Sequence, residues 1–376
     1  MRNLFFRVLN KLYKIVFFRR ANNSWFKDFE HFRSYAKNVL TKGERNDAIA
    51  YFKKYGFDIR TDWHNYYKYM TGTFDNKFIP ADVMYTAIVP YLNYMPFELA
   101  YQDKGIYRRL LPNVKTPKTI VQRIHGYFYL EDWNTPISGK KAIEICSNLQ
   151  DSIIKPTVNS CQGHGVKLFS TNNGLLQTGE NVKSLFAQYG MNFIIQERVK
   201  QHEFLSSLNE SSLNTMRILT LHLKDEVVVL SKAIRIGGKG SITDNGYGGG
   251  FCTGIEEGGS LKPHGYRLTT GEHIDELQNG VKLAGLKIPH FEKVIAKAKE
   301  LALSLPYLRL IGWDFTIDKD GDPVFIEMNT LPGIYIMQLC NGPVFGKYTD
   351  ELLKSVSSVK YGLTQKLDCS YSREDF

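Results

Sequence analysis

Residues 311–333 read IGWDFTIDKDGDPVFIEMNTLPG, and no other stretch of the chain says as much about its fold. Two short runs in it, residues 311–317 and Pro323–Asn329, alternate between apolar and polar side chains, which is typical of β-strands. The dipeptide Asp320-Gly321 stands between them and is a strong signal for a two-residue hairpin turn. The sequence therefore predicts a β-hairpin.

The predicted hairpin brings acidic side chains together. Counting outward from Lys319 and Asp322, which would pair beside the turn, sets Asp314 opposite Glu327. Directly opposite residues have Cβ atoms only about 4.5–5.5 Å apart, so the two carboxylates repel each other. Asn329 shares the face of Glu327, because strand side chains alternate with a period of two. Two carboxylates and an amide oxygen suit Mg²⁺, and the alternative is an exposed hairpin with solvated acids.

The composition favours a folded protein with anionic partners. Hydrophobic residues make up 43% and aromatic residues 13% of the 376 residues, which can support a sizeable core in two or three structural units. The formal net charge of +10 points to nucleotide phosphates, an acidic substrate or anionic lipid. We expect no nucleic-acid partner, because the sequence has no Arg-rich tract and no RNA-binding signature.

The cysteines and histidines form no recognisable ligand pattern. The five cysteines are widely scattered and never stand in a CxxC arrangement, and the nine histidines include no HExxH motif. This usage favours a reducing cytosol over a disulfide framework or a structural zinc site. No uninterrupted apolar run reaches the length of a transmembrane helix. We therefore expect a cytoplasmic protein.

Residues 1–20, MRNLFFRVLNKLYKIVFFRR, have a basic amphipathic pattern. Apolar residues recur at helical spacing, with Arg7, Lys11 and Lys14 on the opposite side. These cations interrupt the apolar stretch that a secretory signal requires. We prefer a helix that lies on an anionic membrane surface, which would make the protein peripheral at the inner membrane face. The alternative is a helix that docks on its own domain.

The predicted secondary structure changes along the chain from mostly helices to mostly strands. Residues 21–100 are rich in aromatics and lysine and predict a mostly helical N-terminal region. Short apolar strands punctuated by glycine follow, among them residues 193–196, 216–222 and 227–236, and a helix is predicted over 291–303. This order predicts an α+β chain with antiparallel strand pairs rather than a series of βαβ units.

A lysine and two glycines suggest a phosphate-binding loop. In residues 153–166, IIKPTVNSCQGHGV, Lys155 ends a strand, and Gly163 and Gly165 follow in a loop. Glycine allows the backbone to approach a polyanion closely, and its N–H groups can form an anion-binding concavity. The segment is not a Walker A loop, because GxxxxGK[ST] is absent, and a plain hairpin turn is the alternative.

Further charged residues lie at predicted strand ends. Glu197 and Glu203 can bracket a nucleotide, with backbone groups near Val199 meeting the base and Glu203 meeting the ribose. They are equally compatible with ordinary surface charges. Arg217 and Arg235 suit a phosphate or carboxylate through bidentate contacts, or a structural ion pair.

The order of these segments resembles the ATP-grasp superfamily, over about residues 103–333. DFTIDKDGDPVFIEMNTLPG is similar to the corresponding element of D-alanine–D-alanine ligases. LNESSLNTMRILT and AIRIGGKGSITDNGYGGG resemble still more closely the sugar-transfer-associated ATP-grasp proteins of polysaccharide gene clusters. We accordingly expect an ATP-grasp fold, two α+β subdomains gripping ATP, with these units: an amphipathic helix (1–20), a helical region (21–100), an ATP-grasp domain (101–345) and a C-terminal helix and tail (346–376).

The resemblance implies a role for each site residue. The groups expected to hold ATP are Lys104, Lys155, Gly163 and Gly165 on the phosphates, Glu197 and Val199 on adenine, and Glu203 on ribose, with Lys232 as a further phosphate contact. The groups expected to hold Mg²⁺ are Asp314, Glu327 and Asn329. The groups expected to face the acceptor are Arg217, Arg235, Asp244 and Asn245, and the catalytic ones among all these are Arg217, Arg235 and Lys155. Cys161-Gln162 departs from the small residues that many relatives carry in this loop.

The activity that follows is that of an ATP- and Mg²⁺-dependent ligase. Such an enzyme joins a carboxylate to an amine or a thiol through an acylphosphate, and the resemblance suggests an acidic sugar of a capsule or surface polysaccharide as the carboxylate. Two alternatives stay open: a phosphotransferase that phosphorylates a sugar hydroxyl, and a non-catalytic nucleotide-binding scaffold for glycosyltransferases. The paired acids weigh against the scaffold, which has no need of them.

Overall fold

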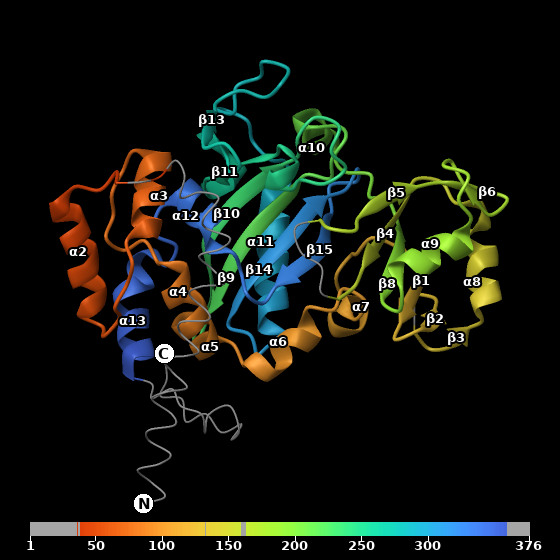
Figure 1. Ribbon diagram of the computed structural model, residues 1–376, viewed down its shortest axis with the longest axis horizontal. Coiled ribbons are helices and arrows are strands. Elements are labelled where there is room, and N and C mark those ends of the chain that lie inside the picture. Colours follow the sequence, from red (N-terminus) through yellow and green to blue (C-terminus); the bar gives the residue numbers. More distant parts are fainter. Residues whose placement is uncertain (1–35, 37, 132, 159–162, 359–376) are drawn as a thin grey trace, which may run out of the picture.

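A computed structural model describes residues 36, 38–131, 133–158 and 163–358. It has a mixed α+β architecture, as the sequence predicts, and its sheets are antiparallel. A large central sheet lies between a group of helices and a smaller sheet (Figure 1). The predicted amphipathic helix of residues 1–20 and the dipeptide at 161–162 lie outside the described residues.

The central sheet has the strand order β13-β12-β11-β10-β9-β14-β15. Its strands are β9 (Thr215–His222), β10 (Val227–Ile236), β11 (Phe251–Ile255), β12 (Leu261–Arg267), β13 (Glu272–Ile274), β14 (Leu310–Ile317) and β15 (Pro323–Asn329). The strands predicted over 216–222 and 227–236 are β9 and β10, so both predictions are confirmed.

The smaller sheet has the order β3-β2-β1-β8-β4-β5. Its strands are β1 (Thr119–Ile124), β2 (Tyr127–Tyr129), β3 (Pro136–Ile137), β4 (Ser152–Pro156), β5 (Lys167–Phe169) and β8 (Phe193–Glu197). A separate two-stranded pair is formed by β6 (Thr171–Asn172) and β7 (Leu175–Leu176).

Helices precede, connect and follow the strands. Those before the first strand are α2 (Lys42–Lys53), α3 (Asp62–Thr71), α4 (Ala81–Val83), the π-helix η1 (Met84–Ile88), α5 (Val89–Leu92), α6 (Met95–Tyr101) and α7 (Tyr107–Leu110). Those within the smaller sheet's segment are α8 (Gly139–Ile145), η2 (Cys146–Asn148) and α9 (Val182–Tyr189). The remainder are α10 (Glu203–Leu208), η3 (Gly246–Gly248), η4 (Glu257–Gly259), α11 (Phe291–Leu303), α12 (Ile334–Asn341), η5 (Gly346–Tyr348) and α13 (Thr349–Ser358).

The two faces of the central sheet are covered by different helices. On β9, Met216 and Ile218 belong to the hydrophobic cluster that includes the buried side of α11. Leu219 and Leu221 belong to a second cluster, which joins α12 to the N-terminal helices. This division follows from the two-residue period of a strand, which sends alternate side chains to opposite faces.

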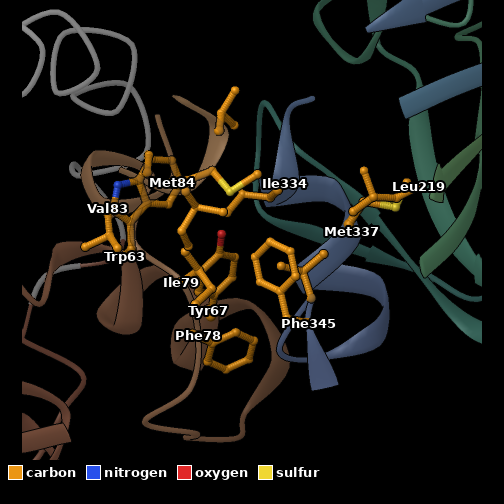
Figure 2. Close-up of a cluster of buried hydrophobic side chains, with 14 of the residues drawn as sticks. Trp63, Tyr67, Phe78, Ile79, Val83, Met84, Leu219, Ile334, Met337 and Phe345 are labelled. Carbon is orange, nitrogen blue, oxygen red and sulfur yellow. The ribbon is translucent and has the colours of Figure 1, made fainter. Parts of the chain in front are cut away.

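The N-terminal helices and α12 share a densely aromatic core. Figure 2 shows Tyr67 and Phe78 packed near Phe345, with Met337 of α12 reaching toward Leu219 of β9. The rings of Tyr67 and Phe78 stack with centroids 4.5 Å apart. This packing places the N-terminal helices against the central sheet through α12. Within the part of the chain that the structure describes, no helix combines the length and apolar character needed to cross a bilayer.

The turn of the predicted hairpin differs from the prediction. Ile317 pairs with Pro323, and beyond them the Asp318 N–H donates to the Asp322 carbonyl at 3.0 Å. The loop therefore has three residues rather than two, with Gly321 at φ +84° closing it. A three-residue loop with glycine in the left-handed region is the next commonest hairpin connection.

The predicted pairing of the two acids is nevertheless confirmed. Near the loop the register is one residue away from the prediction, since Phe315 pairs with Phe325. A β-bulge then leaves Ile326 without a partner, and Asp314 pairs with Glu327. The three-residue loop shifts the pairing by one residue, and the bulge shifts it back, so the two acids are opposite each other as predicted.

Candidate active site

A cavity of about 700 Å³ lies between the two sheets. The smaller sheet contributes residues of β4, β5 and β8, and the central sheet contributes residues of β9, β10 and β15. The N-terminal segment and the start of α12 close it with Gln102, Lys104 and Tyr335. Residues from separate parts of the chain therefore face one enclosed space, as expected for a ligand site.

A row of charged side chains crosses the central sheet beside this cavity. Glu327 of β15 pairs with Asp314 of β14, and Asp314 pairs with Arg217 of β9. Arg217 donates to Asp314 through Nε and, at 2.9 Å, through a terminal nitrogen. Arg235 of β10 donates to Asp314 Oδ2 at 2.8 Å. Asp314 is completely buried, and both of its oxygens accept hydrogen bonds from arginines.

The protonation of Asp314 is decided by these arginines. Burial by itself raises the pKa of a carboxyl group, but the charges of Arg217 and Arg235 outweigh it and hold the pKa of Asp314 below its ordinary value. Asp314 is therefore an ionised carboxylate in a buried site. The sequence left open whether Arg217 and Arg235 bind a ligand or form a structural ion pair, and the structure shows the ion pair with both arginines also lining the cavity.

Asp244 extends this network at the edge of the cavity. Its Oδ2 accepts a hydrogen bond from the Thr215 N–H at 3.1 Å and lies 3.3 Å from Arg235 Nε. Burial raises the pKa of Asp244, while Arg235 opposes the rise. Asp244 therefore holds Arg235 and the beginning of β9. Asp244 and Asn245 both line the cavity, on the side expected to receive the acceptor.

Two of the three residues expected to bind Mg²⁺ face the cavity. Glu327 and Asn329 line it, whereas Asp314, beside Glu327 in the ladder, is absent from the residues that line the cavity in the described chain and has both oxygens bonded to arginines. Among the described residues, no group of three or more His, Cys, Asp or Glu side chains is arranged to hold a metal ion. An Mg²⁺ site at this cavity would therefore rest on Glu327 and on the amide oxygen of Asn329, a ligand type that Mg²⁺ accepts.

Two lysines face the same end of the cavity. Lys155 lies on β4 beside Ile153, and both line the cavity. Burial lowers the pKa of Lys155 to about 8, repulsion from Lys104 adds to the fall, and Glu327 opposes it. Lys104 Nζ lies 3.5 Å from Glu327 Oε2. These two ammonium groups near Glu327 are suited to anionic phosphates.

The glycine loop borders the same cavity as the lysines. Gly163 and Gly165 have φ of +71° and +75°, and a Cβ at Gly165 would lie 2.9 Å from Pro156. Gly163 and His164 line the cavity, whereas Gly165 is absent from the described lining and lies where a side chain would clash with Pro156. Both glycines are thus required by the backbone.

The residues predicted to bind adenine line the described cavity, whereas the residue predicted to bind ribose does not. Glu197 and Val199 line the cavity, and Glu197 also pairs with Lys118 at 2.7 Å. Glu203 begins α10, is exposed, and is absent from the residues that line the cavity in the described chain. Glu210, in the connection between α10 and β9, lines it instead.

Lys232 also lies away from the described cavity lining. Its ammonium group pairs with Glu257, and its carbonyl accepts a hydrogen bond from Asn341 at 3.0 Å. Its neighbour Ala233 belongs to the α12 side of the sheet, so Lys232 lies on the opposite face from Arg235. Strand alternation alone could have separated Lys232 from the arginines.

Several cavity residues were not singled out in the sequence, among them Glu210, Gln102 and Tyr335. Glu210 lies within the quoted LNESSLNTMRILT but was given no role there. Tyr335 offered a weak signal, because it follows the quoted 311–333 motif by two residues. The other two are brought in by the path of the chain.

Two α+β units that enclose a cavity, with lysines on one unit and an acidic hairpin on the other, define an ATP-grasp architecture. The chain belongs to the sugar-transfer associated ATP-grasp family, whose family model matches residues 88–354. None of the curated proteins matches it significantly.

Solved structures show only distant likenesses. An N5-carboxyaminoimidazole ribonucleotide synthetase in its ADP complex is 13% identical with a TM-score of 0.38, and the match covers 70% of this chain and 53% of that one. An L-amino acid ligase from Bacillus licheniformis is 16% identical with a TM-score of 0.38, covering 71% and 51%. The VanG D-Ala:D-Ser ligase from Enterococcus faecalis is 15% identical with a TM-score of 0.39, covering 67% and 60%. The chain thus spans between 51% and 60% of the lengths of these three proteins.

The first prediction concerns the stability supplied by Asp314. Asp314→Asn should lower the free energy of unfolding by about 3–5 kcal/mol, because it leaves the buried guanidinium of Arg217 without its counter-charge and Arg235 with Asp244 alone. Glu144→Ala removes the exposed pair with Lys141 and should cost less than about 0.5 kcal/mol. Urea denaturation of both variants measures the difference. Equal losses would show that the Asp314 network is not a stabilising ion pair.

The second prediction concerns pH. Because the pKa of Lys155 is lowered to about 8, its positive charge is fully present well below that pH and is lost above it. The dissociation constant for ATP should therefore rise between about pH 7 and about pH 9, as one cation facing the phosphates disappears. Calorimetric titrations across this range measure it. Lys155→Met should bind weakly with a flatter profile, and a flat wild-type profile would contradict the assignment.

The third prediction separates two glutamates. Glu210→Gln should raise the KM for ATP about tenfold if its carboxylate accepts hydrogen bonds from the nucleotide, since a charged hydrogen bond contributes about 1.5–3 kcal/mol. Glu203→Gln, which changes an exposed residue outside the described cavity lining, should leave the KM unchanged. Steady-state ATP hydrolysis or ligation assays compare them. The reverse order of effects would restore the original ribose assignment to Glu203.

Proposed function

We propose that the protein is an ATP- and Mg²⁺-dependent ligase that joins a carboxylate to an amine or a thiol. The observation that carries the proposal is the meeting of Lys104 and Lys155 with Glu327 and the Arg217–Asp314–Arg235 network at one cavity. Cations suited to phosphates and oxygen donors suited to Mg²⁺ lie together at one end. The arginines lie next to these donors through Asp314, and Asn245 lines the same cavity.

The reaction proceeds in two balanced steps. A carboxylate oxygen of the substrate attacks the γ-phosphorus of ATP, and the bond from that phosphorus to the oxygen bridging it to the β-phosphate breaks. ADP departs, and the substrate carboxylate has become an acylphosphate. The amine nitrogen or thiol sulfur then attacks the carbonyl carbon, the carbon–oxygen bond to phosphate breaks, and the nucleophile releases a proton. The products are ADP, phosphate and an amide or thioester.

The residues of the chain contribute position and charge. Lys104 and Lys155 neutralise the phosphate oxygens, and the partly buried setting of Lys155 strengthens that attraction. Arg235 and Arg217 face the reacting carboxylate and the transferred phosphoryl group, already oriented by Asp314. Glu327 and Asn329, with Asp314 next to Glu327 in the ladder, would hold Mg²⁺, which when bound supplies charge neutralisation at the phosphates.

The carboxylate is proposed to belong to an acidic sugar. The sugar-transfer association of the family supports this choice, and the positive charge of the chain suits an acidic acceptor. The biological setting proposed is the assembly of a capsule or another surface polysaccharide.

Product analysis tests the proposal. The protein is incubated with ATP, Mg²⁺ and panels of uronic acids and amines, and the products are identified by mass spectrometry. We expect ADP, free phosphate and an amide, and we expect Glu327→Gln to remove turnover while its circular dichroism and unfolding midpoint stay near those of the wild type.

Other products would point elsewhere. ADP with a phosphorylated sugar and no free phosphate would support a sugar kinase. Nucleotide binding with no turnover over the whole panel would support a scaffold for glycosyltransferases. Unchanged turnover in Glu327→Gln would contradict the metal assignment.

A further inference from the structure

Two buried polar side chains of the N-terminal helical segment reach the end of the acidic hairpin. Asn93, between α5 and α6, is fully buried, and Glu98 of α6 is 3% exposed. Both contact Thr330, the residue directly after Asn329. Buried polar groups need hydrogen-bond partners, and both side chains have one in Thr330.

Asn93 ties the two strands of the hairpin together at its open end. Its Nδ2 donates to the carbonyls of Thr330 and Leu310, each at 2.8 Å, and its Oδ1 accepts from the Leu310 N–H at 2.9 Å. Leu310 begins β14, and Thr330 follows the last residue of β15. One side chain therefore links both strands at the end of the hairpin opposite the loop.

Glu98 fixes the side chain of the same residue. The Thr330 hydroxyl donates to Glu98 Oε1 at 2.9 Å, and Gln102 Nε2 donates to the Thr330 oxygen at 3.3 Å. Thr330 is fully buried, and its carbonyl and its hydroxyl both have hydrogen-bond partners in the N-terminal segment. A further contact lies just beyond, where the Tyr85 hydroxyl donates to the Pro332 carbonyl at 3.1 Å.

We propose that Asn93 and Glu98 are positioning residues for the metal-binding end of β15. They hold Thr330, and through the rigid backbone they fix Asn329 and Glu327 relative to Asp314. This inference rests on the proposed Mg²⁺ site. It gives residues 93–98, which run from the end of α5 into α6, a part in the chemistry without contact with a substrate.

The need for such positioning follows from the donor set. Asn329 must supply an oxygen beside Glu327, yet it is the last residue of β15. It pairs with Gly312 of β14, and its side chain adds only a long bond, from Nδ2 to the Gly312 carbonyl at 3.3 Å. Residues at strand ends fray unless they are tied, and Mg²⁺ demands near-ideal octahedral geometry. Asn93 and Glu98 supply the missing restraint, in the way that outer partners orient metal ligands elsewhere.

A matched buried asparagine separates this role from a general structural one. Asn65 is 7% exposed and also makes three backbone hydrogen bonds, accepting from the N–H groups of Val39 and Leu40 at 3.0 Å and donating to the Thr61 carbonyl at 3.1 Å. It lies in α3, and its partners belong to the N-terminal region. Asn65→Ala should therefore destabilise the fold as Asn93→Ala does, but leave the hairpin in place.

The experiment measures Mn²⁺ binding by electron paramagnetic resonance with ADP present, together with the unfolding midpoint, for the full chain. Asn93→Ala and Glu98→Ala should weaken Mn²⁺ binding roughly 10–100-fold, the usual effect of losing an outer partner of a metal ligand. Glu98→Gln keeps an acceptor for the Thr330 hydroxyl and should restore binding to within about threefold of the wild type. Asn65→Ala should bind Mn²⁺ as the wild type does.

Each result decides the matter. Equal Mn²⁺ affinities for Asn93→Ala and Asn65→Ala, with similar losses of stability, would overturn the positioning role. If Asn93→Ala does not fold, the pair Glu98→Ala and Glu98→Gln makes the same test, and equal weakening in both would overturn it. A wild-type protein that binds no Mn²⁺ with ADP would instead overturn the proposed function, on which the inference rests.

Discussion

The carboxylate of Asp314, buried between Arg217 and Arg235, is the interaction on which the rest of the site depends. The three residues come from β14, β9 and β10, three adjacent strands of the central sheet. Buried charges are costly unless they are paired, so these strands must keep one register at the cavity end. The same requirement fixes the backbone of β15, because Glu327 lies opposite Asp314.

One face of the central sheet is apolar along part of its strands and charged where those strands reach the cavity. On β9, Leu219 and Leu221 lie under α12 and the N-terminal helices, while Arg217, on the same face, lines the cavity. The helices thus cover the apolar part of the face and stop where the charges begin. Their last segment then turns to Thr330 through Asn93 and Glu98, so the packing of the N-terminal region and the order of the site are linked.

The sequence predicted the hairpin and the meeting of its acids, because strand periodicity and turn residues are local properties. It missed the three-residue loop, and Asp314 met Glu327 only because the bulge at Ile326 restored the register. Bulges carry little local signal, since the extra residue is an ordinary apolar one. Glu203 and Lys232 were expected at the nucleotide, yet neither lines the described cavity, because α10 and the alternation of β10 direct them elsewhere.

By itself the sequence determined the α+β class, the strands that carry the charges and the chemical types brought together: lysines, acids and arginines. Those follow from periodicity, glycine positions and the order of motifs along the chain. Only the tertiary structure decided that Arg217 and Arg235 share Asp314, that Glu210 lines the cavity, and that Asn93 reaches Thr330 across 237 positions of sequence. Contacts between distant segments depend on how sheets and helices pack, and no local pattern in a chain records that packing.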